Sequence, residues 1–195
     1  MDSASQPFPG SRVVGTDDDD SRLVERCLEG DRDALAELVV RYQRPIYHLA
    51  YRMLGNVEDA QEITQGVFLK VAERLDEYDP GHKFFSWIYR ITINASLNLL
   101  RRNGHEELRG EDPDVADDRL DPEASLNAAQ QSARVQKALL GLKMENRAVL
   151  TLRHFAECSY REISQILEVD EKTVKSRLYE GRQQLRTLLK DLEDQ

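Results

Sequence analysis

An internal acidic segment divides this chain and restricts what it can fold into. Residues 103–131 carry a net charge of −7, and the stretch from Gly104 to Pro122 is punctuated by Gly, Pro and Asp with no apolar periodicity. A segment of that composition lacks a hydrophobic face to bury, so it predicts a linker over residues 104–122. The chain of 195 residues is therefore expected to fold as two separate pieces.

The two pieces are predicted to be an N-terminal domain over residues 21–103 and a C-terminal domain over residues 123–195. A second acidic stretch, residues 1–20 with a net charge of −4, is expected to be a disordered tail. The tail and the linker hold the surplus acid, because residues 21–102 are neutral and residues 132–195 carry +2. The net charge of −9 therefore does not exclude a nucleic-acid partner.

Both pieces are predicted to be all-α, because apolar residues recur at spacings of three and four and strand-like alternation is absent. Pro45 lies inside the second helical pattern and is expected to kink or interrupt it. Ser159 with Glu162 forms a capping box, and Asp170 is expected to cap the last helix. The expected helices are 20–30, 32–54, 58–75, 83–102, 123–140, 144–156, 160–168 and 171–190.

The last two helices have the pattern of a helix-turn-helix motif, with a tight connection at Glu168-Val169-Asp170. One face of the final helix is apolar and is expected to pack inward: Val174, Leu178, Gly181, Leu185 and Leu188. The opposite face carries the donors that phosphates and base edges require: Lys172, Lys175, Ser176, Tyr179, Arg182, Gln183 and Arg186. The alternative is a solvated charged face on an ordinary bundle helix.

The helix expected at 83–102 combines a buried side with a mixed arc. Lys83, Arg90, Asn94, Asn98 and Arg101 share this arc with Trp87. Cations and amides interleaved with an aromatic ring suit single-stranded nucleic acid, where rings stack on bases and cations follow phosphates. The alternative is that Trp87 is simply a core residue.

The sequence contains no enzyme signature, so no catalytic residue, cofactor or metal is expected. It lacks a Gly-rich phosphate loop, a nucleophile elbow and a His-Glu-x-x-His pair, and its four histidines have no partner at metal-ligand spacing. Cys27 and Cys158 are expected to be reduced thiols. With neither a signal peptide nor a transmembrane segment, the protein is expected to be cytoplasmic and not inserted in a membrane.

Several motifs, in combination and order, resemble the extracytoplasmic-function (ECF) group of bacterial sigma factors. The resemblance covers about 160 residues, outside the tail and the linker. It rests on Gly30-Asp31 with Ala34 and Leu38, Tyr42 to Tyr47, Asp59 to Gln65, Phe68, Phe85 to Ile91, Asn94, Leu99, Arg101-Arg102, Tyr160 to Ile163, and Thr173 to Leu178.

The resemblance implies a transcription initiation factor that binds core RNA polymerase, at its β′ clamp helices and β flap, and promoter DNA. The implied polymerase-binding residues are Asp59, Glu62, Gln65, Gly66, Leu69, Lys70 and Glu73. The residues implied to recognise and melt the −10 element are Tyr78, His82, Lys83, Phe85, Trp87, Arg90, Asn94, Asn98, Arg101 and Arg102. The residues implied to read the −35 element are Lys172, Thr173, Lys175, Ser176, Arg177, Tyr179, Arg182, Gln183 and Arg186. An anti-sigma partner is also implied.

Four positions depart from the family pattern. Glu is usual where Gly66 stands, and Gly is common where Lys172 stands. A basic residue is common at the position of Glu180, and an acidic residue at that of Asn98. The departures at Lys172 and Glu180 predict an unusual −35 preference.

Two other functions remain open at this point. A dimeric helix-turn-helix regulator would bind a palindromic site without polymerase. A sigma mimic that sequesters an anti-sigma protein would not need the basic face of the last helix.

Overall fold

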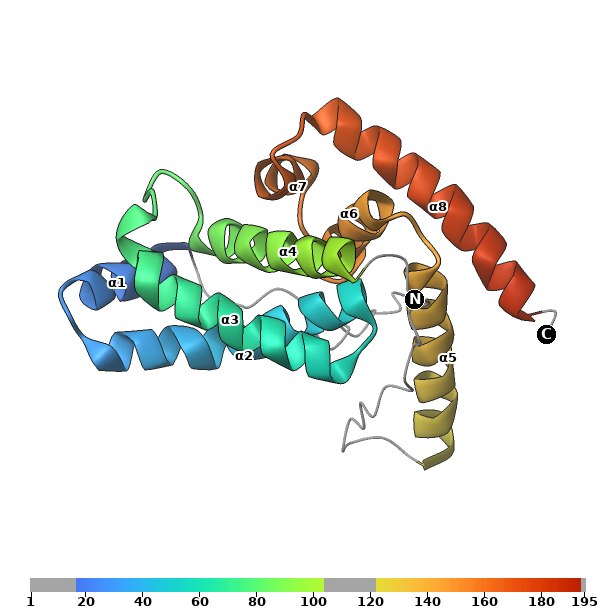
Figure 1. The fold of residues 1–195 in the computed structure, drawn as a ribbon, viewed down its shortest axis with the longest axis horizontal. Helices are drawn as coiled ribbons and strands as arrows, with labels where there is room; N and C mark the ends of the chain where they lie inside the picture. The colour runs from blue at the N-terminus through green and yellow to red at the C-terminus, as the bar shows by residue number, and fades with distance from the viewer. Residues whose placement is uncertain (1–16, 104–121, 194–195) are drawn as a thin grey trace, which may run out of the picture.

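The computed structural model describes residues 17–103 and 122–193, and this part of the chain is entirely helical (Figure 1). It consists of α1 (Asp17–Leu28), α2 (Arg32–Leu54), α3 (Val57–Arg74), the 3-10 helix η1 (Leu75–Glu77), α4 (Phe84–Arg102), α5 (Pro122–Leu140), α6 (Met144–His154), α7 (Tyr160–Leu167) and α8 (Glu171–Glu193). The all-α prediction is confirmed. None of the described helices is long and apolar enough to span a membrane.

Helices α1 to α4 form the first domain, with α2 packed against the other three. Local signals set the ends of α2: the Asp31 carboxylate caps its first turn, and Gly55 ends it in the left-handed conformation at φ 73°. Of the two effects expected at Pro45, a kink or an interruption, the interruption does not occur, because α2 runs unbroken from Arg32 to Leu54. Packing on three sides outweighs the single hydrogen bond that a proline removes.

Helix α1 includes the last four residues of the expected acidic tail, residues 17–20. Asp20 is buried, and its carboxylate accepts hydrogen bonds from the Tyr42 hydroxyl and, at 2.6 Å, from Nη1 of Arg41. Burial and then the Asp20 carboxylate raise the pKa of Tyr42 far above its usual value. Acidic residues in a first helical turn also interact favourably with the helix dipole. The rest of the expected tail, and nearly all of the linker, lie outside the described residues.

Helices α5 to α8 form the second domain. The predicted capping box is confirmed, since the Ser159 hydroxyl accepts from the backbone of Glu162 and the Glu162 carboxylate accepts from the backbone of Ser159. Asp170 caps α8 by accepting from the Thr173 amide at 2.5 Å. Gly181 lets α8 approach α6 closely, because a Cβ there would lie 2.9 Å from Cδ1 of Leu150.

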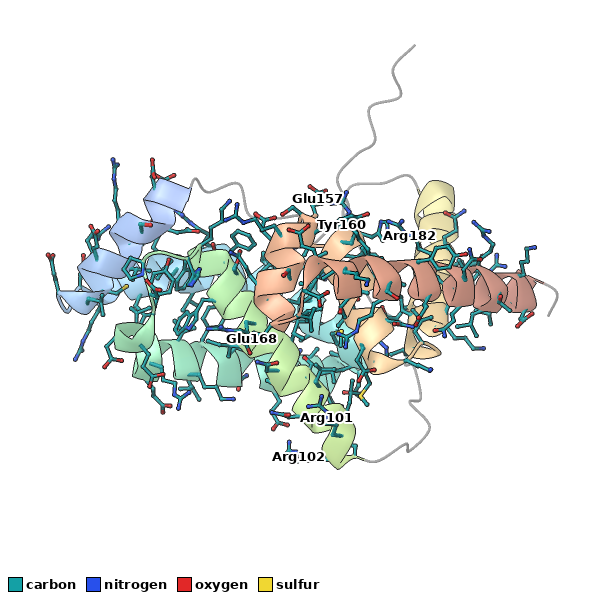
Figure 2. The ribbon with its side chains drawn as sticks, turned by 90° about the horizontal axis from the view of Figure 1, so that it is seen from above. Arg101, Arg102, Glu157, Tyr160, Glu168 and Arg182 are labelled. Carbon is teal, nitrogen blue, oxygen red and sulfur yellow. The ribbon has the colours of Figure 1, made fainter. Side chains whose placement is uncertain are left out.

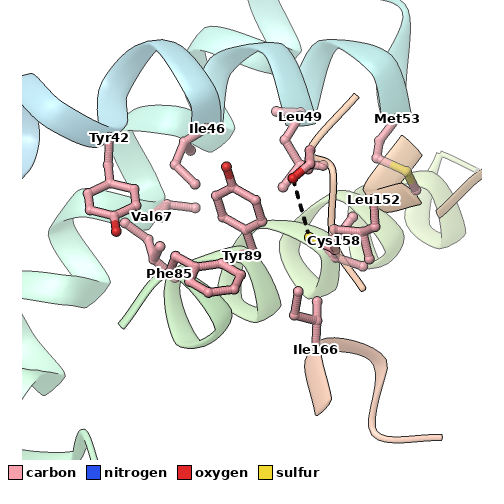
Figure 3. Close-up of a cluster of buried hydrophobic side chains, with 14 of the residues drawn as sticks. Tyr42, Ile46, Leu49, Met53, Val67, Phe85, Tyr89, Leu152, Cys158 and Ile166 are labelled. Carbon is pink, nitrogen blue, oxygen red and sulfur yellow. Dashed lines mark hydrogen bonds between the residues drawn. The ribbon is translucent and has the colours of Figure 1, made fainter. Parts of the chain in front are cut away.

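The two domains share one apolar core. Figure 3 shows Leu152, Cys158 and Ile166 of the second domain in the same buried cluster as Leu49 and Tyr89 of the first. Helix α7 packs on α4, and α5 and α6 pack on α2. The structure is therefore closed, with the helix-turn-helix unit resting on the first domain (Figure 1).

Candidate nucleic-acid interface

The final helix presents the basic face that its sequence predicts. Val174, Leu178 and Gly181 are buried, which turns the opposite side of α8 outward. Thr173 and Arg177 are half-buried, whereas the other seven predicted −35 residues are exposed: Lys172, Lys175, Ser176, Tyr179, Arg182, Gln183 and Arg186. We call these nine residues the α8 stripe. An exposed set of cations, amides and hydroxyls on the second helix of a helix-turn-helix can contact both phosphates and base edges.

His154 lies beside this stripe, although nothing in the sequence pattern indicates it. Its Nε2 is 3.4 Å from Nη2 of Arg182, because the end of α6 packs beside α8. Partial burial, and then the charges of Arg182 and Arg153, lower the pKa of His154. A neutral imidazole can therefore hold the Arg182 guanidinium without adding a like charge.

The ten predicted −10 residues, which we call the α4 face, differ widely in exposure. Tyr78 is 6% exposed and Phe85 is 4% exposed, so neither ring is accessible in this conformation. Trp87 is half-buried, with its ring 5.6 Å from Tyr78 and 5.8 Å from Phe84 between centroids. The Tyr78 hydroxyl donates to the His82 carbonyl, which closes the preceding loop on itself.

The polar residues of the α4 face separate into two groups. Asn94, Asn98, Arg101 and Arg102 are exposed towards the end of α4, where Nη1 of Arg101 donates to Oδ1 of Asn98 at 3.2 Å. Lys83 and Arg90 instead face the second domain. Nζ of Lys83 lies 3.3 Å from Oε1 of Glu162, and Nη1 of Arg90 lies 3.1 Å from Oε1 of Glu168. Figure 2 shows Glu168 over α4, away from Arg101 and Arg102.

The residues implied to bind polymerase form one outer side of α3, which we call the α3 face. Five of them are exposed, namely Glu62, Gln65, Leu69, Lys70 and Glu73, while Asp59 and Gly66 are half-buried. Leu69 is a large apolar side chain with 65% of its surface exposed, and a Cβ at Gly66 would meet nothing within 4 Å. An apolar side chain ringed by charges, beside a residue without a side chain, is suited to close packing of another helix.

Two buried side chains, Arg147 and Gln136, form hydrogen bonds between the domains that the sequence does not predict. We call these hydrogen bonds the polar lock. Arg147, only 2% exposed, donates from Nη1 to the Met53 carbonyl and from Nη2 to the carbonyls of Leu140 (2.6 Å) and Leu142 (3.2 Å). Gln136, equally buried, donates to the Tyr51 carbonyl at 3.1 Å. These donors satisfy carbonyls at the C-terminal end of α2, where the helix dipole also favours a cation.

Burial lowers the pKa of Arg147 to about 10. No signal in the sequence singles out Arg147 or Gln136, since each partner carbonyl of α2 lies more than 80 positions away. Among the described residues, no group of His, Cys, Asp and Glu side chains could hold a metal ion.

Two family models match the chain, one in each domain. Sigma-70 region 2 matches residues 38–106, and Sigma-70 region 4 matches residues 132–185. The first match covers the α3 and α4 faces, and the second covers nearly all of the α8 stripe.

Individual relatives extend the similarity over most of the chain. The chain is 36% identical over 182 residues to the ECF RNA polymerase sigma factor SigW of Bacillus subtilis, covering 88% of this chain and 97% of that protein. It is 39% identical over 190 residues to the ECF RNA polymerase sigma factor SigE of Mycolicibacterium smegmatis, covering 94% and 74%.

Two solved structures share the fold. CnrH in complex with the cytosolic domain of CnrY has a TM-score of 0.70 at 24% identity, over 89% of this chain and 98% of that one. The sigma factor RpoE of Bartonella quintana, in complex with the anti-sigma factor NepR, has a TM-score of 0.63 at 21% identity, over 80% and 96%.

The matched regions define a sigma-70-type transcription factor. The chain belongs to the ECF group of RNA polymerase sigma factors. This assignment confirms the resemblance noted from the motifs and does not favour the dimeric regulator.

Proposed function

We propose that this sigma factor binds core RNA polymerase through the α3 face, opens the −10 element with the α4 face and reads the −35 element with the α8 stripe. It performs no catalysis of its own and acts in the cytoplasm. The observation that carries the proposal is the α8 stripe, an exposed row of donors backed by a buried apolar face on the second helix of a helix-turn-helix.

Melting is assigned to α4 because aromatic rings, amides and cations are combined on that helix. Trp87 is held at the edge of an aromatic cluster with Tyr78 and Phe84, so its position is fixed while part of its ring stays accessible. Unstacking a base costs a few kcal/mol, and stacking on a ring returns about 1–3 kcal/mol. Asn94 and Asn98 supply amides near Arg101 and Arg102, which suit phosphates.

We also assign to this chain an anti-sigma partner, since the similar RpoE was solved with one. A partner that covers the α3 face or holds the two domains together would keep the factor from polymerase. The exposed Leu69 supports an apolar anchor point for such a partner on the α3 face.

The proposal is tested by co-elution with bacterial core RNA polymerase, followed by run-off transcription on a library of promoter fragments. We expect co-elution and new start sites that depend on the factor. The matched variants are Leu69→Ala on the α3 face and Val40→Ala on α2, because both residues are large, exposed and apolar. Leu69→Ala is expected to weaken co-elution about tenfold or more, as truncating an interface anchor does, and Val40→Ala to leave it unchanged. DNA binding by a dimer without polymerase would instead identify a conventional regulator.

A further inference from the structure

Two carboxylates of the helix-turn-helix unit lie on two cations of the α4 face. Glu162 of α7 reaches Lys83 at 3.3 Å, and Glu168 in the turn after α7 reaches Arg90 at 3.1 Å. Lys83 and Arg90 are separated by about two turns of α4, and their partners are separated by a similar length of α7 and its turn. The second domain therefore places two negative charges along α4, beside two cations of the face that our proposed function assigns to the −10 strand.

The Glu162 carboxylate is fixed in this position by its own helix. Its Oε2 accepts from the backbone amide of Ser159 at 2.8 Å, which completes the capping box, and its Oε1 is left for Lys83. The side chain is 11% exposed, so little rotamer freedom remains to be lost when the ion pair forms. Glu168 lies in a different setting. Its backbone ends α7 in the left-handed conformation at φ 53°.

Other contacts between the domains lie between α5 or α6 and the end of α2. Arg147 and Gln136 bind carbonyls at the end of α2, and Leu140 packs against Gly55. The two ion pairs themselves are partly exposed, with side-chain exposures of 42% for Lys83, 38% for Arg90 and 67% for Glu168. Pairs of this kind contribute little individually and are screened by salt, so they can be exchanged for other anions.

We infer that Glu162 and Glu168 act as an intramolecular substitute for DNA phosphates, so that the free sigma factor occupies its own −10 surface. The second domain must leave α4 before Lys83 and Arg90 can contact single-stranded DNA. This inference rests on the proposed function of α4. It predicts that the free chain binds single strands weakly because the cations are occupied, in addition to any repulsion by the acidic segments.

The first test uses the full chain without polymerase and a fluorescein-labelled single-stranded oligonucleotide of mixed sequence. The variant is Glu162→Gln with Glu168→Gln, which keeps the capping box because Gln also serves at that position. The matched control is Glu145→Gln with Glu157→Gln, which removes the same charge from the second domain. The ion pairs to the first domain in the described structure involve Glu162 and Glu168 and neither control residue. Glu157 also shares the left-handed backbone of Glu168.

We expect the Glu162→Gln, Glu168→Gln variant to bind the oligonucleotide about tenfold more tightly at low salt, and the control to change by less than twofold. Freeing two cations should make the slope of log affinity against log salt concentration more negative by about 1.4, since each phosphate contact on a single strand contributes about 0.7. An equal gain in both double variants, or an unchanged slope, would overturn the inference.

A second measurement detects the closed state directly. A water-soluble carbodiimide joins an amine to a carboxylate with loss of water, so the wild-type chain should yield a Lys83–Glu162 cross-linked peptide in mass spectrometry. Core polymerase, or excess oligonucleotide, should suppress that peptide. Its absence from the free chain, or its persistence with the oligonucleotide bound, would overturn the inference, whereas failure of core-dependent transcription would overturn only the proposed function.

Discussion

The α4 face and the α8 stripe differ in how far the closed chain leaves them accessible. On α8, seven of the nine predicted residues are exposed, and among the described residues no ion pair ties the stripe to the first domain. On the α4 face, Tyr78 and Phe85 are buried, and Lys83 and Arg90 lie against carboxylates of the second domain. The α8 stripe is therefore largely accessible, whereas the α4 face is partly covered.

The physical difference follows from the role that we propose for each surface. Reading a duplex in the major groove needs only exposed donors on a rigid helix, which α8 offers as it stands. Holding an unpaired strand needs aromatic rings and cations, and such a surface is attractive to any acidic partner, including this chain's own α7. Four substitutions test this difference between the two surfaces.

The largest effect is expected for Arg147→Ala, which acts on the lock that holds the second domain over α4. The change removes a buried donor from the carbonyls of Met53, Leu140 and Leu142 and leaves a cavity. We expect the free energy of unfolding in urea to fall by about 3 kcal/mol, as is usual when buried groups lose a charged partner. The matched control is Arg161→Ala on the exposed side of α7, which should change it by less than about 0.5 kcal/mol. If Arg147→Ala lowered the free energy of unfolding no more than Arg161→Ala does, the Arg147 hydrogen bonds would not be holding the domains together.

Arg182→Ala tests the accessible surface. We expect it to reduce discrimination between the −35 element found by run-off transcription and a scrambled element by about 2 kcal/mol, since a good bidentate contact to a base is worth about 1–3 kcal/mol. Binding is measured with the holoenzyme on duplex promoter fragments. Lys190→Ala, an exposed cation on α8 outside the stripe, should weaken both duplexes equally. Unchanged discrimination with Arg182→Ala would remove Arg182 from the reading surface.

Trp87→Ala tests the occupied surface after polymerase has bound. We expect the open complex to form about tenfold less well while the closed complex forms normally, because the lost stacking is worth about 1–3 kcal/mol per base. Potassium permanganate footprinting reports the opening. Trp87→Phe keeps a ring within the cluster with Tyr78 and Phe84 and should restore most of it. Normal opening with Trp87→Ala would exclude a stacking role.

The smallest effect is expected for the pH dependence of His48→Gln in α2. Partial burial, and then the charges of Arg44 and Arg52, lower the pKa of His48 to about 4, so the unfolded chain binds its proton more readily than the folded one. The contribution to stability is present above pH 6.5 and is lost as the pH falls towards 4. We expect wild type to lose about 1 kcal/mol more than the variant over that window in urea denaturation, after allowing for solvent screening. If the unfolding free energies of wild type and His48→Gln changed with pH in parallel, the result would contradict a half-buried, neutral His48 imidazole.

Local physics allowed the helices to be predicted closely. Apolar spacing placed α2 at Arg32–Leu54 and α4 within one residue of its start, and the capping box at Ser159 and the cap at Asp170 are present as expected. The exposed side of α8 also followed, because the buried positions of an amphipathic helix determine which residues remain outside. Every one of these features depends on residues a few positions apart.

The hydrogen bonds and ion pairs between the two domains are features of the tertiary structure that the sequence did not predict. Glu162 meets Lys83 across 79 positions, Glu168 meets Arg90 across 78, and Arg147 meets the Met53 carbonyl across 94. Helical periodicity carries no information over such distances, and the intervening linker leaves the docking geometry open. Local sequence patterns indicated which side of α8 is exposed, and the family resemblance indicated the faces that we propose bind polymerase and DNA. Only the packing of α5, α6 and α7 on the first domain decided that one of these surfaces is covered, because buried carbonyls and cations must find partners wherever the fold supplies them.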